Sequence, residues 1–172
     1  MFQNQNYNKY IAINGDRGIS LMEILIVVAI LAFSITSLLG LISLSLTSSL
    51  STEHTTQADE LAKETMEQVR NFRDGTNWDT NGLGTLSIGS DYYPKETGSP
   101  AVWQMISGTD TSGEFSKKVV FSNANRDAND NIVSSGGTVD TYTKKITVTI
   151  SWEQKGKDYQ RQLITYLTDW KK

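Results

Sequence analysis

An uncharged apolar segment, Ile24 to Leu46, lies close to the start of this 172-residue chain and limits what the chain can fold into. A helix rises about 1.5 Å per residue, so this segment would extend about 34 Å, slightly more than the roughly 30 Å hydrocarbon core of a bilayer. Glu23 directly precedes it. The sequence therefore predicts a transmembrane helix with a single carboxylate at its start.

The charges on either side of this segment predict its orientation. The first 18 residues are polar and include Lys9 and Arg17, whereas the first lysine after the segment is Lys63. Because positive residues favour the cytoplasmic side, the leader should stay in the cytoplasm and the C-terminal bulk should cross the membrane. An ordinary secretory signal is cut after an apolar stretch of only about 7–15 residues. A plain signal anchor, or a signal cut near Ser49 to Ser51, remains the alternative.

The residues before and at the start of the apolar segment form a recognisable pattern: Arg17, Gly18, Ile19, Ser20, Leu21, Met22 and Glu23. With the long apolar helix behind it, this pattern resembles the processing site of the type IV pilin family. The resemblance implies that a prepilin peptidase cuts after Gly18 and that the new N-terminus, Ile19, is N-methylated. Family members most often carry Phe at that position, and Ile19 keeps its apolar character.

Glu23 has two interpretations. In the first, the helix dipole mildly favours its negative charge at the start of a helix, and Glu23 has no further role. The pilin resemblance instead assigns it to subunit docking, because a cut after Gly18 creates an ammonium group at Ile19, one turn away. In a packed array of helices, Glu23 of one subunit can pair with the Ile19 amine of its neighbour. In a low-dielectric setting, that pairing removes two unpaired charges at once.

A second helical pattern follows the Ser/Thr-rich stretch from Thr47 to Thr52. One stripe of residues, apolar apart from Thr65, recurs at spacings of three and four: Ala58, Leu61, Ala62, Thr65, Met66, Val69 and Phe72. Gly75 is a suitable stop signal. We therefore predict one long helix from Ile19 to Asp74, with Gly40 as a weak point. Two helices joined by a Ser/Thr hinge remain the alternative.

The sequence after Gly75 predicts an antiparallel sheet with one face toward the amphipathic helix. Strands are expected at 115–122, at 142–153, where apolar and polar residues alternate, and at 160–168, with weaker candidates at 85–88 and 101–106. The four tryptophans, Trp78, Trp103, Trp152 and Trp170, are expected to fill the helix–sheet interface. The predicted α+β, type IV pilin-like fold has four parts: a leader (1–18), a transmembrane or filament-core helix (19–46), an amphipathic helix half (47–74) and a β head (75–172).

Three further segments, 69–74, 147–152 and 165–170, are similar to parts of PilV-type minor pilins. The resemblance implies a minor pilus subunit in the inner membrane, with its head outside the cytoplasm until it joins a cell-surface pilus. The implied partners are prepilin peptidase, other pilins, and the pilus platform protein with its assembly ATPase. A pseudopilin of type II secretion or DNA uptake shares all these residues. A single-pass, surface-anchored binding module is the alternative of another class.

Little else in the sequence points to chemistry. Its only histidine, His54, lies in a polar stretch and is expected to be a solvated surface residue, and there are no cysteines. Asp127, Asn129 and Asn131 have calcium-loop spacing, but Ile132 stands where a glycine is needed and Thr138 where a glutamate is needed, so a polar loop without metal is expected. A net charge of −3 argues against nucleic-acid binding. We predict no cofactor and no enzymatic activity.

Overall fold

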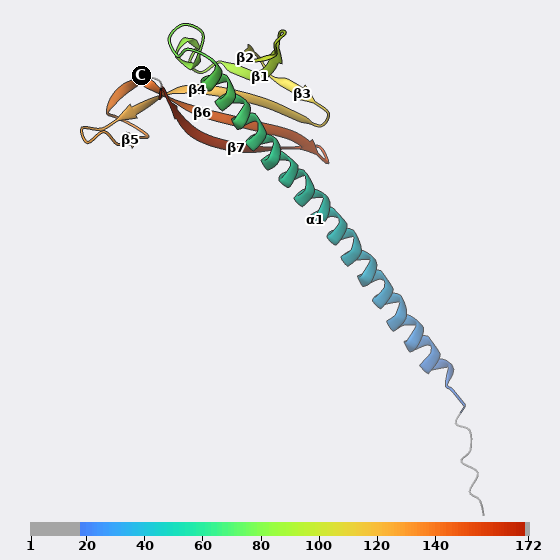
Figure 1. Cartoon of the computed structure of the whole chain (residues 1–172). Helices are drawn as coiled ribbons and strands as arrows, with labels where there is room; N and C mark the ends of the chain where they lie inside the picture. The colour runs from blue at the N-terminus through green and yellow to red at the C-terminus, as the bar shows by residue number, and fades with distance from the viewer. Residues whose placement is uncertain (1–17, 171–172) are drawn as a thin grey trace, which may run out of the picture. The chain divides into compact units, whose positions relative to one another are not determined.

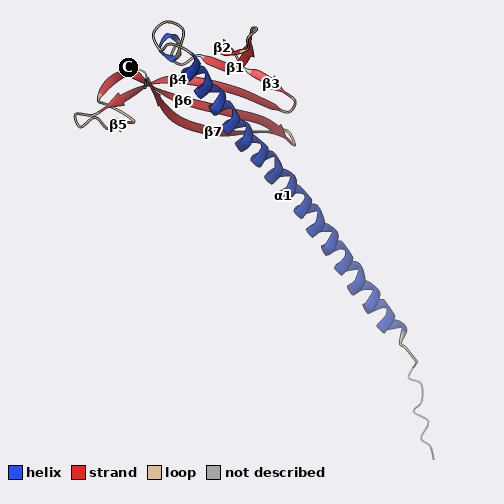
Figure 2. Cartoon of the chain, viewed as in Figure 1, coloured by secondary structure: helices blue, strands red, loops and turns tan. Residues whose placement is uncertain are grey.

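The structure, a computed structural model, describes residues 18–170, so the leader residues 1–17, with Lys9 and Arg17, lie outside the described part. One long helix is followed by a short 3-10 helix and an antiparallel sheet (Figure 2). The elements are α1 (Leu21–Gly75), η1 (Leu83–Thr85), β1 (Asp91–Thr97), β2 (Val102–Ser107), β3 (Asp110–Ser112), β4 (Phe115–Arg126), β5 (Ile132–Val133), β6 (Thr138–Gln154) and β7 (Lys157–Thr168).

Helix α1 is 55 residues long and is continuous through Gly40 and through the Ser/Thr-rich stretch, so the two-helix alternative is wrong for this structure. Hydroxyl groups of that stretch, which can compete with backbone hydrogen bonds, instead donate within the helix. Thr55 Oγ1 donates to the carbonyl of Ser51 at 2.9 Å, and Thr56 Oγ1 donates to that of Thr52 at 3.0 Å. The predicted C-terminal boundary at Gly75 is confirmed.

The chain divides into two units, one ending at Ser48 and the other beginning at Ser49, so α1 contributes to both. The second unit contains the sheet, whose strands lie in the order β2-β1-β4-β6-β7, with β3 and β5 pairing to parts of β4 (Figure 1). Every pairing in it is antiparallel. The coarse prediction of a long helix followed by an antiparallel head is therefore confirmed.

The core of the second unit joins the stripe of α1 to one face of the sheet. Its fully buried members include Ala58 and Val69 from the helix and Ile146, Val148 and Ile150 from β6. The apolar face predicted from Ile146 to Trp152 is thus confirmed, but Thr149 on the opposite face is buried as well. Burying each of the valine and isoleucine side chains contributes about 1.5–3 kcal/mol.

The alternation fails at the start of the same strand. Tyr142, which lies on the apolar side of the predicted alternation, is exposed, whereas its neighbours Thr143 and Lys144 are buried. The cause is a register shift: Asn123 pairs with Lys144, but the next residue, Ala124, pairs with Asp140. A bulge that shifts the pairing by an odd number of residues exchanges the two faces of the strand.

The prediction was also wrong around residue 90. The candidate strand at 85–88 is not a strand, and β1 (Asp91–Thr97) was not predicted. Pro94 and the charged pair Lys95 and Glu96 give β1 a poor strand pattern. Pro94 is nevertheless buried, and β1 is held along its length by β2, with only two residue pairs to β4.

Two single-residue expectations need correction. Trp170 is 63% exposed, with its indole Nε1 donating to Asp74 Oδ1 at 3.1 Å, so only Trp78, Trp152 and, in part, Trp103 pack in the core. His54 is not a solvated residue, because its side chain is 22% exposed and its ring packs edge-on to Phe115 at 6.1 Å. Periodicity could not show this, because the contact joins the helix to the start of β4, which is distant in the sequence.

We predict that Ile150→Ala will lower the free energy of unfolding of the head by about 2–5 kcal/mol, because the deletion leaves a cavity between helix and sheet. Tryptophan fluorescence during urea unfolding in detergent micelles measures this directly, since all four tryptophans lie after residue 77. Ile164→Ala, at a half-exposed position on β7, is the control and should cost less than about 1 kcal/mol. Equal losses would contradict the burial assigned here.

Candidate functional site at the start of α1

Gly18, Ile19 and Ser20 stand directly before α1 in extended or irregular backbone, and all three are exposed. The helix starts at Leu21, and the carbonyl oxygen of Ser20 accepts the N–H groups of Glu23 at 2.9 Å and Ile24 at 3.2 Å. The peptide bond between Gly18 and Ile19 therefore lies outside regular secondary structure, where a protease can reach it.

Gly18 has no structural reason to be a glycine in the folded chain. A Cβ atom built at this position meets nothing within 4 Å, and its φ is not in the left-handed region that favours glycine. The space around Gly18 and its backbone conformation would thus accept a larger residue. Whatever requires a glycine here must act from outside the folded chain.

Glu23 is in the first turn of α1 and is exposed. It is the only ionisable side chain between Gly18 and Thr52 in the sequence. The positive end of the helix dipole favours a negative charge at this position, by about 0.3–1 kcal/mol when the site is in water. In an apolar environment that contribution is far smaller than the cost of the charge, so Glu23 would need a cationic partner there.

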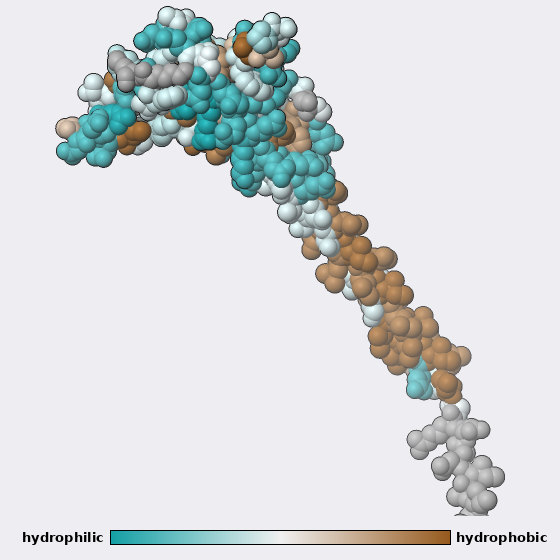
Figure 3. All heavy atoms as spheres, viewed as in Figure 1, coloured by the Kyte–Doolittle hydropathy of each residue, from teal (hydrophilic) through white to brown (hydrophobic). Residues whose placement is uncertain are grey.

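The helix behind Glu23 is apolar on all sides and has no buried residue in its first 26 positions. Its large apolar side chains from Ile24 to Leu46 are between 50% and 77% exposed. Figure 3 shows this half of α1 as a continuous apolar surface on the visible face. By length and composition it could span a membrane.

Three of the polar side chains in this half of the helix are satisfied by the helix itself. Ser34, Thr36 and Ser37 each donate their hydroxyl to the carbonyl four residues earlier, at 2.8, 2.8 and 2.9 Å. A hydroxyl satisfied in this way costs little in lipid or in a helix bundle, because no unpaired donor remains. Glu23 is the one ionisable side chain of the segment, and the helix itself offers it no cationic partner.

In the structure, Gly18, Ile19 and Glu23 all lie within about one helical turn of Leu21, where α1 begins. Arg17, the basic residue of the sequence pattern, lies outside the described residues. A cut between Gly18 and Ile19 would leave an ammonium group beside Glu23, so that one end of the helix would carry a cation and an anion. Two such helices side by side could exchange these charges, amine to carboxylate.

The loop with calcium-like spacing is closed by its own hydrogen bonds. Asp127 Oδ1 accepts the backbone N–H groups of Asn129 and Asn131, both at 2.9 Å, and Oδ2 accepts the side-chain amide of Asn131 at 3.2 Å. These donors, led by those of Asn131, lower the pKa of Asp127. Since N–H groups already point at both oxygens, this carboxylate is arranged as a turn cap.

Sequence reasoning missed the charge cluster beside this loop. Arg126 Nε donates to Asp140 Oδ2 at 2.7 Å, and Arg126 Nη1 donates to the carbonyl of Asp130 at 2.7 Å. Thr143, then Arg126 and the Tyr142 N–H, lower the pKa of Asp140, while Asp140 raises that of Arg126. The cluster lies at the bulge of β6, and no spacing in the sequence signals it.

Comparison of the chain with protein-family models, with curated proteins and with solved structures gives no match. No relative therefore indicates a role for the start of α1 or for the head.

Asp140→Asn should lower the free energy of unfolding by about 1 kcal/mol at pH 7, less than a fully buried charged hydrogen bond because solvent reaches the cluster. A carboxylate whose folded pKa is lowered stabilises above its unfolded pKa, near 3.9, and that contribution is lost as the pH falls through the folded pKa. The difference between the two proteins should therefore shrink below about pH 4.

Urea unfolding at several pH values measures this difference. Asp79→Asn, at an exposed loop position, is the control and should follow the wild-type protein at every pH. A deficit of Asp140→Asn that stays constant down to pH 2 would show that the ionised carboxylate is not the stabilising group.

Proposed function

We propose that this chain is a type IV pilin-like subunit, cut by a prepilin peptidase after Gly18 and N-methylated at Ile19. It then waits in the cytoplasmic membrane, held by the apolar half of α1, and is drawn into a helical filament. The chain is then the substrate of an enzyme, and the bond between Gly18 and Ile19 is the one that is cut. The observation that carries the proposal is the carboxylate of Glu23, which pairs with no cation among residues 18–170 and lies one turn after an exposed Gly–Ile bond, at the start of a helix that is apolar all round.

Three features support this proposal over a plain membrane anchor. An anchor needs neither the exposed Gly18, which packing does not require, nor Glu23, which adds cost in lipid. A pilin needs both, the first for cleavage and the second for pairing with the amine of a neighbour. The amphipathic second half of α1, with its stripe buried against an antiparallel sheet, also suits a subunit whose head is carried by the helix.

We propose a minor subunit, because segments 69–74, 147–152 and 165–170 are similar to PilV-type minor pilins. Other pilins, the platform protein and the assembly ATPase would be its partners, and the mature head would lie outside the cytoplasm. A pseudopilin of type II secretion or DNA uptake would use the same residues at the start of α1. A minor pilin and a pseudopilin differ in the assembly system that incorporates the protein, so identifying that system distinguishes them.

Cleavage is tested by the intact mass and N-terminal peptide of the membrane-extracted protein, with and without a co-expressed prepilin peptidase. We expect a chain beginning at methylated Ile19 only when the peptidase is present. Gly18→Val should abolish the cut and leave the head folded, because nothing packs against this position. Gly40→Ala, a change to the other glycine of the apolar half, should be processed normally. A chain that still starts at Met1, or is cut near Ser49, would refute the proposal.

Docking is tested with Glu23→Gln, which keeps the shape of the side chain and removes its charge. We expect it to be cut after Gly18 like the wild-type protein but to be at least tenfold depleted from the sheared filament fraction, because the neighbour's amine loses its partner. Glu53→Gln, at the next acidic residue along the helix, is the matched control and should assemble. Normal assembly of Glu23→Gln would favour the anchored binding module.

A further inference from the structure

Strand β2 forms one edge of the sheet, where part of its backbone points away from the other strands. The N–H group of Gly108, directly after β2, donates to the carbonyl of Asp91 at 2.8 Å, so these two residues form a hydrogen-bonded pair. Such pairs alternate with non-hydrogen-bonded pairs along an antiparallel ladder, so Trp103 and Met105 stand in non-hydrogen-bonded pairs. Pro94, which has no N–H group, stands opposite Met105 and agrees with this assignment. The N–H and C=O groups of Trp103 and Met105 therefore point outward from the edge.

A pocket of about 560 Å³ lies beside this edge, between β2 and the C-terminal end of α1 with the loop that follows it. Its apolar lining includes Phe72 from the helix, Leu86 from the loop, and Trp103 and Met105 from β2. Phe72 is buried and the other three are partly buried against the core. None of the described residues that line the pocket is charged. The two residues whose backbone points outward thus also supply side chains to the pocket.

The groups at this edge define the chemistry of what can cover it. Trp103 and Met105 present two sets of N–H and C=O groups about 7 Å apart, which is the two-residue repeat of a strand. Another polypeptide in extended conformation carries matching groups at the same spacing. Its residues that pair with Trp103 and Met105 also direct their side chains to the face of the sheet on which the pocket lies. A charged side chain there would meet no counter-charge among the lining residues, so an uncharged apolar one fits.

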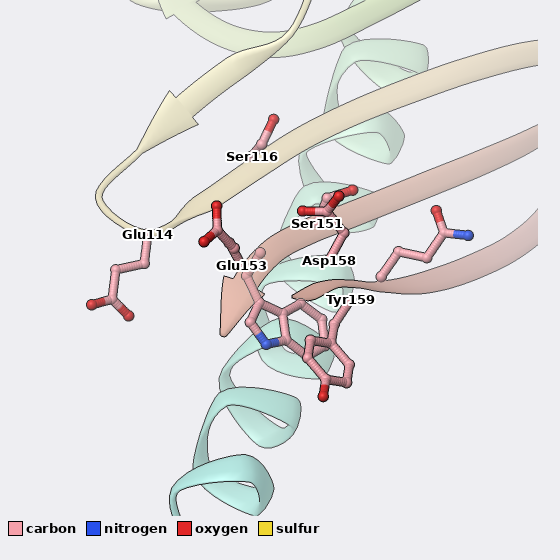
Figure 4. A pocket seen from close by; sticks show the side chains of 8 residues that line it. Glu114, Ser116, Ser151, Glu153, Asp158 and Tyr159 are labelled. Atoms are coloured by element: carbon pink, nitrogen blue, oxygen red, sulfur yellow. The ribbon is translucent and has the colours of Figure 1, made fainter. Parts of the chain in front are cut away.

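The opposite edge of the sheet, β7, lacks this combination. Lys155 and Gly156, both with positive φ, form the two-residue turn of the β6–β7 hairpin, so the residues that flank the turn form a hydrogen-bonded pair. The next pair includes Asp158, whose backbone groups therefore point outward. Figure 4 shows the side chains of Glu153 and Asp158 on the side of the hairpin opposite Tyr159. Charged side chains of this kind protect an edge strand against pairing.

We propose that β2 binds an extended segment of a protein partner as an additional strand, with an uncharged apolar side chain of that segment in the pocket. The backbone of the segment would form hydrogen bonds with Trp103 and Met105, and its side chain would lie against Phe72 and Leu86. Main-chain bonds would supply the affinity and the pocket would supply the specificity. This interaction does not depend on a cut after Gly18, so its failure would leave the proposed function untouched.

The test uses the full chain in uncharged detergent micelles, titrated with acetyl-Thr-Val-Thr-Leu-Thr-amide, whose two apolar side chains share one face. Its matched control carries N-methyl groups on the valine and the leucine, which removes the two donors that would face β2 and keeps the side chains. NMR measures hydrogen exchange of the Trp103 and Met105 amides. We expect the unmodified peptide to slow this exchange at least tenfold in a saturable manner. No saturable protection, or equal protection by the N-methylated peptide, would overturn the proposal.

Two proline variants separate this edge from the other one. Met105→Pro removes an outward N–H group without breaking a bond to β1, so it should weaken binding at least tenfold. Ile164→Pro makes the same kind of change on β7, at another outward-pointing position, and should leave binding within twofold. Equal weakening by both variants would overturn the assignment to β2. The comparison of the two peptides uses the wild-type protein, so it decides the proposal even where a proline variant fails to fold.

Discussion

The burial of the α1 stripe against the sheet is the contact on which the rest of the head depends. A two-layer arrangement of one helix on one sheet has a single core, and here that core is made where Ala58 and Ala62 let the helix approach β4 and β6. Small residues on the helix and large ones such as Phe121 and Ile150 on the sheet divide the space between them. Strands β1 and β2 contribute only partly buried side chains to this core, those of Tyr92, Trp103 and Met105.

The first half of the same helix packs against no other part of the described chain. From Ile24 to Leu46 the helix is uncharged and exposed, and hydroxyls such as those of Ser34 and Ser37 bond within the helix, so the segment suits an apolar surrounding. The helix changes from apolar on all sides to amphipathic near Ser48 and Ser49, where the chain divides into its two units. One element thus serves two environments, and the Ser/Thr-rich stretch marks the boundary between them.

Periodicity predicted what depends on one element at a time. Sequence spacing fixes side-chain direction, so it predicted the stripe of α1 and the core face from Ile146 to Trp152. The end of the helix at Gly75 was predicted from the glycine itself. Features that depend on two elements were not: the bulge opposite Asn123, the pairing of Arg126 with Asp140, and the packing of His54 on Phe115. The Gly18–Glu23 pattern was found by resemblance, and the structure adds only its exposure.

Hydrophobicity can hold α1 in a membrane, but it cannot choose the neighbours of α1 there. Lipid tails are as apolar as leucine, so burying these side chains against another helix gains little by itself. Selection among neighbours must come from close packing and from the few groups that lipid cannot satisfy. In the first half of α1 the only such ionisable side chain is Glu23, and a carboxylate pairs at one height along a partner helix. A single charge in a long apolar surface is therefore well suited to setting the register between subunits of the proposed filament, a task that many scattered charges would make ambiguous.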